Sequence, residues 1–201
     1  MLRSFWIILL AVLLYGLIHS FLASLWMKAK AKHWFGRLAD RSFRLFYNLF
    51  AFLTLLPVLA LPVLLIDKLL YAIPFPWVVF TLLVQIISFA ALVIGLMQTG
   101  IASFLGLRHL IQKSENEPPL LVVNGLYRWV RHPLYTAGLL FIWLMPRMTC
   151  NLLALNIGLT IYILIGALFE EQKLLREFGD AYAEYHRKTP MLVPGLHFRS
   201  K

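Results

Sequence analysis

Long apolar blocks limit what this chain can fold into more than any other feature of the sequence. Four of them cover residues 5–27, 43–66, 75–98 and 150–169, and a shorter one covers 134–145. A helix needs about 20 apolar residues to cross the hydrocarbon core of a bilayer, where its backbone polar groups must bond to one another. We therefore expect an all-α integral membrane bundle of about five spans.

The composition supports a membrane protein and argues against other classes. Hydrophobic residues make up 61% of the chain and charged residues only 14%, whereas soluble domains carry about a quarter charged residues. The net charge of +10 would favour nucleic-acid binding in a soluble protein. Here it fits loops that meet anionic headgroups, so we expect the lipid bilayer as partner and no nucleic acid. The single cysteine, Cys150, excludes an internal disulfide, and no Cys/His cluster indicates a metal.

The basic residues segregate by side once five spans are assumed. Segments 28–44, 99–133 and 170–201 then share one side and carry sixteen of the 19 Lys and Arg residues. The opposite side carries Arg3, Lys68 and Arg147. Because short cytoplasmic loops are enriched in Lys and Arg, this segregation predicts an outside N-terminus and an inside C-terminus.

The C-terminal tail has a different pattern. Apolar and aromatic residues recur at helical spacing between residues 170 and 186, at Leu174, Leu175, Phe178, Tyr182 and Tyr185. This spacing predicts an amphipathic helix that lies on the membrane or against the bundle, with Gly179 as a point where it could break.

The densest group of residues capable of chemistry lies just before the fourth block. Arg131 and His132 could bind a carboxylate, Pro133 would start a helix, and Gly125 would permit a tight turn. Arg and Tyr side chains also anchor helices at membrane interfaces, and spacing alone favours that commoner explanation.

Acidic and polar residues near the spans form a second set. Glu170 and Glu171 stand where the fifth block ends. They could accept hydrogen bonds from the hydroxyls or ammonium group of a ligand, or simply be solvated. Carboxylates at a helix C-terminus oppose the helix dipole, which favours a partner. His19 and Asn48 lie within or near spans, where polar groups usually join helices, although an ionisable one is a functional candidate.

Several motifs in the second half occur together in order. They are His109–Gln112, Leu121–Tyr127, Arg131–Tyr135, Glu170–Glu171, Phe178–Gly179, Tyr182, Tyr185 and Pro190–Pro194. In this combination the chain resembles the isoprenylcysteine carboxyl methyltransferase family and its bacterial relatives. Pro146–Thr149 and Pro190–Pro194 are most similar to the bacterial small-thiol methyltransferases of that superfamily.

The resemblance implies S-adenosylmethionine as methyl donor, bound without a Rossmann fold. The residues it assigns to the cofactor are His109, Gln112, Gly125, Tyr127, Arg131, His132 and Tyr135, with Glu170 and Glu171 closing the pocket. Arg131, Arg187 or Lys188 would hold the anionic head of the acceptor or the carboxylate of the cofactor. Lys188 stands where the family often has Arg, and Lys cannot make the two-pronged contact of Arg.

The implied activity is methyl transfer to a thiol or carboxylate of a small or lipophilic acceptor. Residues 1–98 would form membrane helices and residues 99–201 the catalytic region. The site would face the cytoplasm from a bacterial inner membrane. Three alternatives stay open: a phospholipid N-methyltransferase, an NADPH-dependent oxidoreductase similar to sterol reductases, and a non-catalytic membrane subunit.

The predicted orientation can be tested by labelling single cysteines introduced into a variant in which Cys150 is replaced by serine. We expect residue 2 to react from the outside, and residues 30, 115 and 198 to be protected there, because sixteen of the 19 basic residues mark the inside. A protected residue 2 would contradict the five-span orientation.

Overall fold

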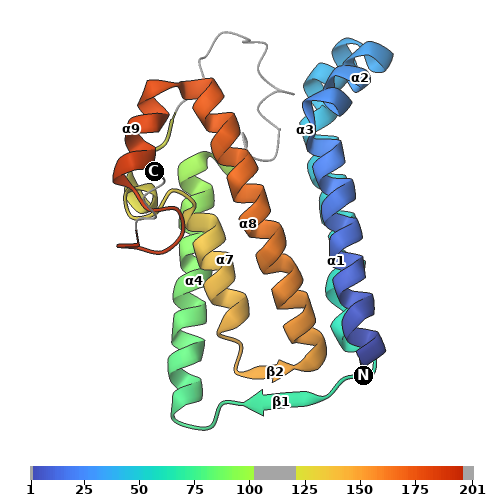
Figure 1. The fold of residues 1–201 in the computed structure, drawn as a ribbon, viewed down its shortest axis with the longest axis vertical. Helices are drawn as coiled ribbons and strands as arrows, with labels where there is room; N and C mark the ends of the chain where they lie inside the picture. Colours follow the sequence, from blue (N-terminus) through green and yellow to red (C-terminus); the bar gives the residue numbers. More distant parts are fainter. Residues whose placement is uncertain (1, 102–120, 197–201) are drawn as a thin grey trace. The chain divides into compact units, whose positions relative to one another are not determined.

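The computed structural model describes residues 2–101 and 121–196, and helices dominate both stretches (Figure 1). The α-helices in these stretches are α1 (Leu2–Ala23), α2 (Leu25–Phe35), α3 (Arg37–Leu64), α4 (Trp77–Thr99), α7 (Pro133–Trp143), α8 (Cys150–Phe178) and α9 (Asp180–Lys188). A short 3-10 helix, η1 (Gly125–Arg128), and two short strands, β1 (Leu69–Ala72) and β2 (Arg147–Thr149), complete the described elements. The prediction of an all-α fold is confirmed, and the small two-stranded sheet is an addition to it.

Four of the described helices are long and apolar enough to cross a membrane: α1, residues 42–64 of α3, α4 and α8. They coincide with the four long apolar blocks, and the chain is an integral membrane protein. The shorter block forms α7, which has 11 residues. At 1.5 Å per residue it is about 16 Å long, roughly half the thickness of the hydrocarbon core.

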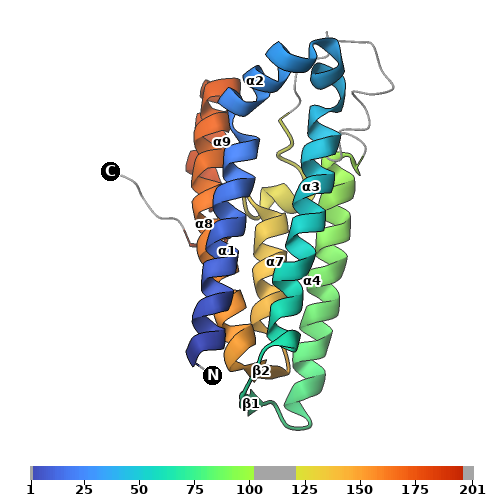
Figure 2. The same ribbon diagram turned by 90° about the vertical axis from the view of Figure 1, so that its right-hand side faces the viewer.

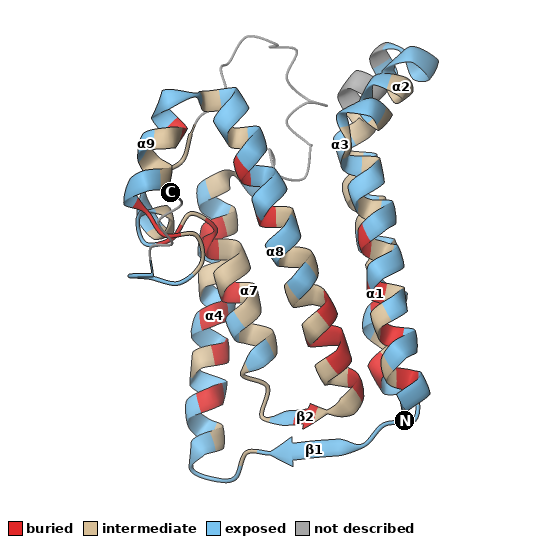
Figure 3. Cartoon of the chain, in the orientation of Figure 1, coloured by how far each residue is buried: buried red, intermediate tan, exposed pale blue. Residues whose placement is uncertain are grey.

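The described residues divide into two compact units. The first contains residues 2–70, 100–101 and 148–162, and the second contains 71–99, 121–147 and 163–196. The division of function at residues 98 and 99 is a separate matter and stays a prediction. In the first unit, the core side chains come from three helices: Ile8, Val12, Val58, Ala154 and Leu155. Figure 3 shows these buried positions along α1 and the start of α8.

The first apolar block was predicted to continue to Met27, and this end is wrong. Helix α1 ends at Ala23, and Ser24 begins α2 with extended backbone while its Oγ accepts from the Met27 amide at 3.2 Å. Serine is a preferred N-cap because its side chain satisfies an amide that the helix leaves unpaired. In Figure 2, α2 crosses between the end of α1 and the start of α3.

The last carbonyls of α3 have no partner within the helix, because the helix ends at Leu64. Asn151, which is fully buried, supplies hydrogen bonds to carbonyls at this end. Its Nδ2 donates to the carbonyl oxygens of Pro62, Leu65 and Ile66 at 3.3–3.4 Å. An apolar medium offers these carbonyls no water, so a side chain takes its place.

The second unit holds α4, α7, the second half of α8 and α9. Helices α4 and α7 run side by side, and Gln85 of α4 donates to the Phe141 carbonyl of α7 at 2.9 Å. The amphipathic segment predicted for residues 170–186 is helical, and the break foreseen at Gly179 is present. Helix α8 continues past Glu170 and Glu171 to Phe178, and Gly179, with φ of 54°, separates it from α9.

Candidate functional site

The segment before α7 is shaped by a glycine. Gly125 begins η1 with φ of +64°, a conformation that favours glycine over residues with a Cβ. A Cβ at this position would lie 2.0 Å from Nε2 of Gln98, a side chain of α4. The same Gln98 accepts from the Leu126 amide through Oε1 at 3.2 Å. Gly125 therefore lets the chain approach α4 closely before it turns toward Arg131.

Residues 189–192, which we call the tail segment, pair with the start of α7. The amides of Arg131 and His132 donate to the carbonyls of Pro190 and Met191 at 2.8 and 3.1 Å. Thr136 Oγ1 adds a bond to the Leu192 carbonyl at 2.7 Å. Pro133 occupies the first turn of α7, where a missing amide proton costs nothing. The motif before the fourth block and the end of the chain are thus joined through backbone atoms.

The guanidinium of Arg131 is the centre of the site. Its Nε and Nη2 each lie 2.6 Å from Oε1 of Glu171. Its Nη1 donates to the carbonyls of His186 and Thr189 at 2.9 and 2.6 Å. The side chain is 8% exposed. Arg131 therefore connects α8, α9 and the tail segment, and all three of its nitrogens bond to protein acceptors.

Glu171 contacts two histidine rings in addition to Arg131. His132 Nε2 lies 3.3 Å from Oε1, and His186 Nε2 lies 3.3 Å from Oε2. The Glu171 side chain is 9% exposed. A carboxylate this well buried needs a cation and several donors to remain ionised. One arginine and two histidine rings provide them.

The neighbouring acid, Glu170, has a different environment. Its side chain is 45% exposed. Tyr135 donates to Glu170 Oε2 at 2.8 Å, and His132 Nδ1 lies 3.6 Å from the same atom. The rings of His132 and Tyr135 stack with centroids 5.3 Å apart. Glu170 is therefore held in place by groups of α7 and still accessible to a molecule from outside.

Three tyrosines line the same end of the unit. Tyr185 donates to the Tyr127 carbonyl at 2.6 Å. Burial raises the pKa of Tyr185 to about 12; the Tyr127 and Glu171 side chains add to the rise, and Arg131 opposes it. Burial, helped by Glu170, raises the pKa of Tyr127 to about 12. The Tyr182 ring is 1% exposed, and its hydroxyl finds no hydrogen-bond partner among the residues that the structure describes.

The structure brings most of the predicted site residues to one end of the second unit. The residues that meet there are Gly125, Tyr127, Arg131, His132, Tyr135, Glu170 and Glu171. His109 and Gln112 lie outside the described residues.

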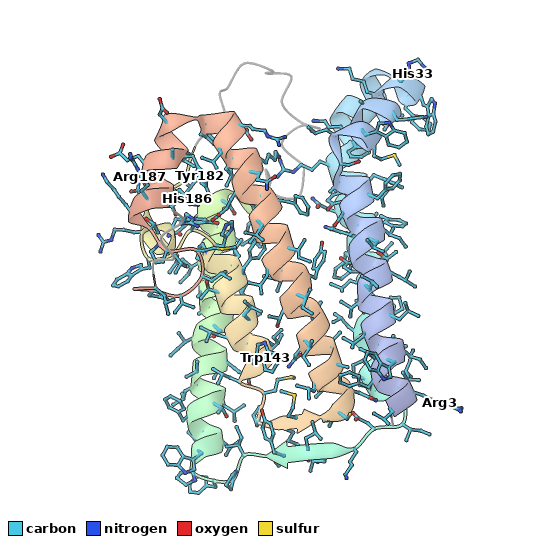
Figure 4. All side chains as sticks on the ribbon, in the orientation of Figure 1. Arg3, His33, Trp143, Tyr182, His186 and Arg187 are labelled. Carbon is cyan, nitrogen blue, oxygen red and sulfur yellow. The ribbon has the colours of Figure 1, made fainter. Side chains whose placement is uncertain are left out.

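The two basic residues of α9 lie apart from the buried cluster. Arg187 and Lys188 are exposed, and Lys188 Nζ pairs with Glu184 Oε1 at 2.6 Å. Figure 4 labels Arg187 on α9 beside Tyr182 and His186. Their predicted contact with an acceptor stays a prediction.

Sequence reasoning missed three contributors to the site. His186 follows Tyr182 by four residues, so helical spacing alone could have placed both on one face. Gln98 is a polar residue at the end of an apolar helix, which is a weaker signal. The Thr189 carbonyl that accepts from Arg131 leaves no signal in the sequence, because every residue has a carbonyl.

The arrangement suits recognition of a polar ligand. No group of His, Cys, Asp and Glu that could hold a metal ion is found within residues 2–101 and 121–196. The accessible Glu170 carboxylate can accept from hydroxyl or ammonium groups. The buried Arg131–Glu171 pair fixes the position of the His132 ring. His132 in turn lies against one side of the Glu170 carboxylate.

Comparison with known proteins gives one family and several relatives. The family described as "Protein of unknown function (DUF1295)" matches residues 3–189. Methanethiol S-methyltransferase 2 of Bradyrhizobium diazoefficiens is 46% identical over 76 residues, which cover 38% of this chain and 29% of the relative. Methanethiol S-methyltransferase of Crocosphaera subtropica is 32% identical over 126 residues, which cover 58% of this chain and 49% of the relative.

A eukaryotic relative acts on a different acceptor. The human protein-S-isoprenylcysteine O-methyltransferase is 31% identical over 91 residues, which cover 43% of this chain and 31% of the relative. The chain thus spans less than half the length of each of these curated relatives. No solved structure matches the chain.

The buried ion pair predicts a large difference between two Glu→Gln substitutions. Glu171→Gln leaves the Arg131 guanidinium buried without a counter-charge, and breaking a buried pair in this way costs about 3–5 kcal/mol. Glu184→Gln is the matched control, because its partner Lys188 is exposed and such pairs contribute little. We expect thermal unfolding of the purified protein in detergent to shift strongly downward for the first variant alone. Equal shifts would contradict the role given to Arg131.

Proposed function

Because the chain belongs to the DUF1295 family and its relatives include named methyltransferases, we propose that it is an integral membrane methyltransferase. It would use S-adenosylmethionine and act on a thiol or carboxylate of a small or lipophilic acceptor. One observation carries this proposal. The Arg131–Tyr135 motif and the Glu170–Glu171 motif, 35 or more residues apart, meet through direct side-chain contacts.

The residues of the site fit such a donor. S-adenosylmethionine supplies an activated methyl group on a sulfonium ion and presents ribose hydroxyls and an ammonium group. Glu170 can accept from those groups while Tyr135 and His132 hold its other side. The Tyr182 hydroxyl is a buried polar atom that still needs a partner within the described part of the chain. His109 and Gln112, outside the described residues, complete the proposed set.

Arg131 would then act as a positioning residue. Its three hydrogen bonds, its ion pair with Glu171 and its burial leave it no face for a ligand in this arrangement. Arg131 fixes the position of Glu171. Glu171 in turn fixes the His132 ring, whose other nitrogen faces Glu170. Methyl transfer depends on alignment of donor and acceptor and on exclusion of water, so rigid support of this kind contributes to the rate.

The acceptor side of the proposal rests on α9. Arg187 is exposed at the same end of the unit, and its guanidinium suits a carboxylate or thiolate head. Lys188, paired with Glu184, is the weaker of the two candidates. Relatives named for methanethiol outnumber those named for isoprenylcysteine among the similar proteins reported above, which supports a thiol. We place the site on the cytoplasmic side of a bacterial inner membrane, where the charged donor is available.

Donor binding provides the direct test of the proposal. S-adenosylhomocysteine should raise the melting temperature of the purified protein, because a ligand that binds only the folded state stabilises it. Glu170→Ala and His132→Ala should each weaken this binding by roughly ten- to hundredfold, as expected for a lost charge-assisted contact. Glu184→Gln, which alters an exposed acid of α9, should bind as the parent does.

Other outcomes of binding and turnover measurements would redirect the assignment. Stabilisation by NADPH in place of S-adenosylhomocysteine would indicate the oxidoreductase alternative. Binding of neither ligand would indicate a non-catalytic subunit. Turnover with phosphatidylethanolamine alone would indicate a phospholipid N-methyltransferase.

The pH dependence of turnover distinguishes the two acceptor classes. With a thiol acceptor, the rate should rise with pH up to the thiol pKa of about 8.5 and level off only above it, because the thiolate is the nucleophile. A carboxylate acceptor is already ionised at neutral pH and should show no such rise from its own titration. Tyr127 and Tyr185, with pKa values of about 12, do not titrate in this range. Rates measured from roughly pH 6 to pH 9 therefore distinguish a thiol acceptor from a carboxylate acceptor.

A further inference from the structure

An apolar pocket lies at the α2 end of the first unit, and its lining includes none of the residues proposed above for methyl transfer. Its volume is about 340 Å³. Side chains of α2 and α3 form most of its wall, among them Met27, Ala31, Trp34, Phe43 and Phe46. A pocket of this kind in a membrane protein is a candidate site for an apolar chain.

The interior of the pocket offers a ligand almost no polar contact. Ser42 and Tyr47 carry the two hydroxyl groups of its wall. The Ser42 hydroxyl donates to the Leu38 carbonyl at 2.7 Å, and the Tyr47 hydroxyl bonds to Nε2 of His19. Both hydroxyls already have partners within the protein, so a charged head group in the interior would lose its hydration without gaining a partner. The interior therefore suits a hydrocarbon chain.

Helix α2 has the composition of a helix at a membrane surface. It follows directly after the end of α1, and Trp26 and Trp34 near its two ends are 56% and 61% exposed. Tryptophan is enriched at the membrane–water boundary. Between them stand Lys28, Lys30 and Lys32, and the helix contains no acidic residue. In Figure 4, His33 of α2 and Arg3 of α1 lie at opposite ends of the first unit, as expected for a helix at one membrane surface.

Lys28 and Lys30 flank the face of α2 that lines the pocket. Positions 27, 31 and 34 share one face of α2 at spacings of four and three residues, and these side chains line the pocket. Lys28 follows Met27 by one residue, or about 100° around the helix. On the other edge, Lys30 Nζ lies 4.9 Å from the Trp26 ring centroid and 5.4 Å from that of Trp34. Positive charge therefore flanks an apolar interior.

We propose that this pocket binds one anionic phospholipid, with an acyl chain inside and the phosphate at the lysines of α2. The match of charge decides this occupant. A zwitterionic lipid would fill the interior equally well but would gain less from Lys28 and Lys30. A free phosphate would satisfy the lysines and leave the apolar interior unused. The proposal does not depend on the methyltransferase assignment, because it uses different residues.

The first experiment measures lipid retention by native mass spectrometry of the full chain in detergent. We expect phosphatidylglycerol to bind more tightly than phosphatidylcholine with the same acyl chains. Lys28→Gln with Lys30→Gln should weaken phosphatidylglycerol binding roughly thirtyfold, since each lysine near an anionic surface contributes about fivefold. The matched double variant Lys173→Gln with Arg176→Gln removes two exposed cations of α8 and should bind as the parent does.

The second experiment tests the pocket itself. Ala31 lines the pocket, whereas Ala29 of the same helix is exposed and does not. Ala31→Trp should abolish phosphatidylglycerol retention, and Ala29→Trp should leave it unchanged. If Ala31→Trp fails to elute as a monodisperse helical protein, a fluorescence experiment with phosphatidylglycerol that carries brominated acyl chains replaces it. The part of the tryptophan fluorescence that this lipid quenches should be smaller in Trp34→Phe than in the parent, because Trp34 lines the pocket.

Four outcomes would overturn the proposal. Equal retention of phosphatidylcholine would make the pocket a general lipid site. Equal affinity for glycerol phosphate, which has no acyl chain, would leave only an anion site on the lysines. Unchanged retention in both the Ala31→Trp and the Lys28→Gln with Lys30→Gln variants would place the lipid elsewhere. Displacement of phosphatidylglycerol by a farnesylated cysteine would make the pocket an acceptor site.

Discussion

The buried ion pair between Arg131 and Glu171 is the interaction on which the rest of the site depends. It removes two charges from water, and that cost is recovered only when nearly every donor and acceptor finds a partner. Here the guanidinium also bonds to the carbonyls of His186 and Thr189, and the carboxylate also meets two histidine rings. The pair therefore forces the segment before α7, helix α8, helix α9 and the tail segment to adopt a single arrangement.

The difference between Glu170 and Glu171 follows from the continuation of α8. The sequence placed both acids at a helix end, where the helix dipole would act against them, and this premise is wrong because α8 runs on to Phe178. Consecutive residues of a helix point about 100° apart. One acid therefore faces the buried arginine, and the other faces outward, where it is 45% exposed.

The sequence predicted what depends on side-chain chemistry and missed what depends on the backbone. Long apolar blocks located the four long helices because hydrocarbon leaves few alternatives to a helix. The structure brings the Arg131 and Glu171 motifs into contact, and their role in binding a cofactor stays a prediction. The Thr189 carbonyl, the capping of α3 by Asn151 and the break at Ser24 were not foreseen, because each depends on how backbone groups are satisfied in three dimensions. His109 and Gln112 lie outside the described residues.

The properties of Arg131 also explain why a lysine would not serve at its position, whereas the contact made by Lys188 is less demanding. Arg131 reaches two carbonyls and one carboxylate at once, which requires three nitrogens fixed in a plane. Lys188 meets a single acid on an exposed surface, a task that a flexible ammonium performs as well as a guanidinium. The geometry of its contacts therefore requires arginine at residue 131, whereas either lysine or arginine can make the contact at residue 188. A lysine at residue 188, where the resemblance seen in the sequence implies Arg, therefore leaves the buried contacts between Arg131 and Glu171 unchanged.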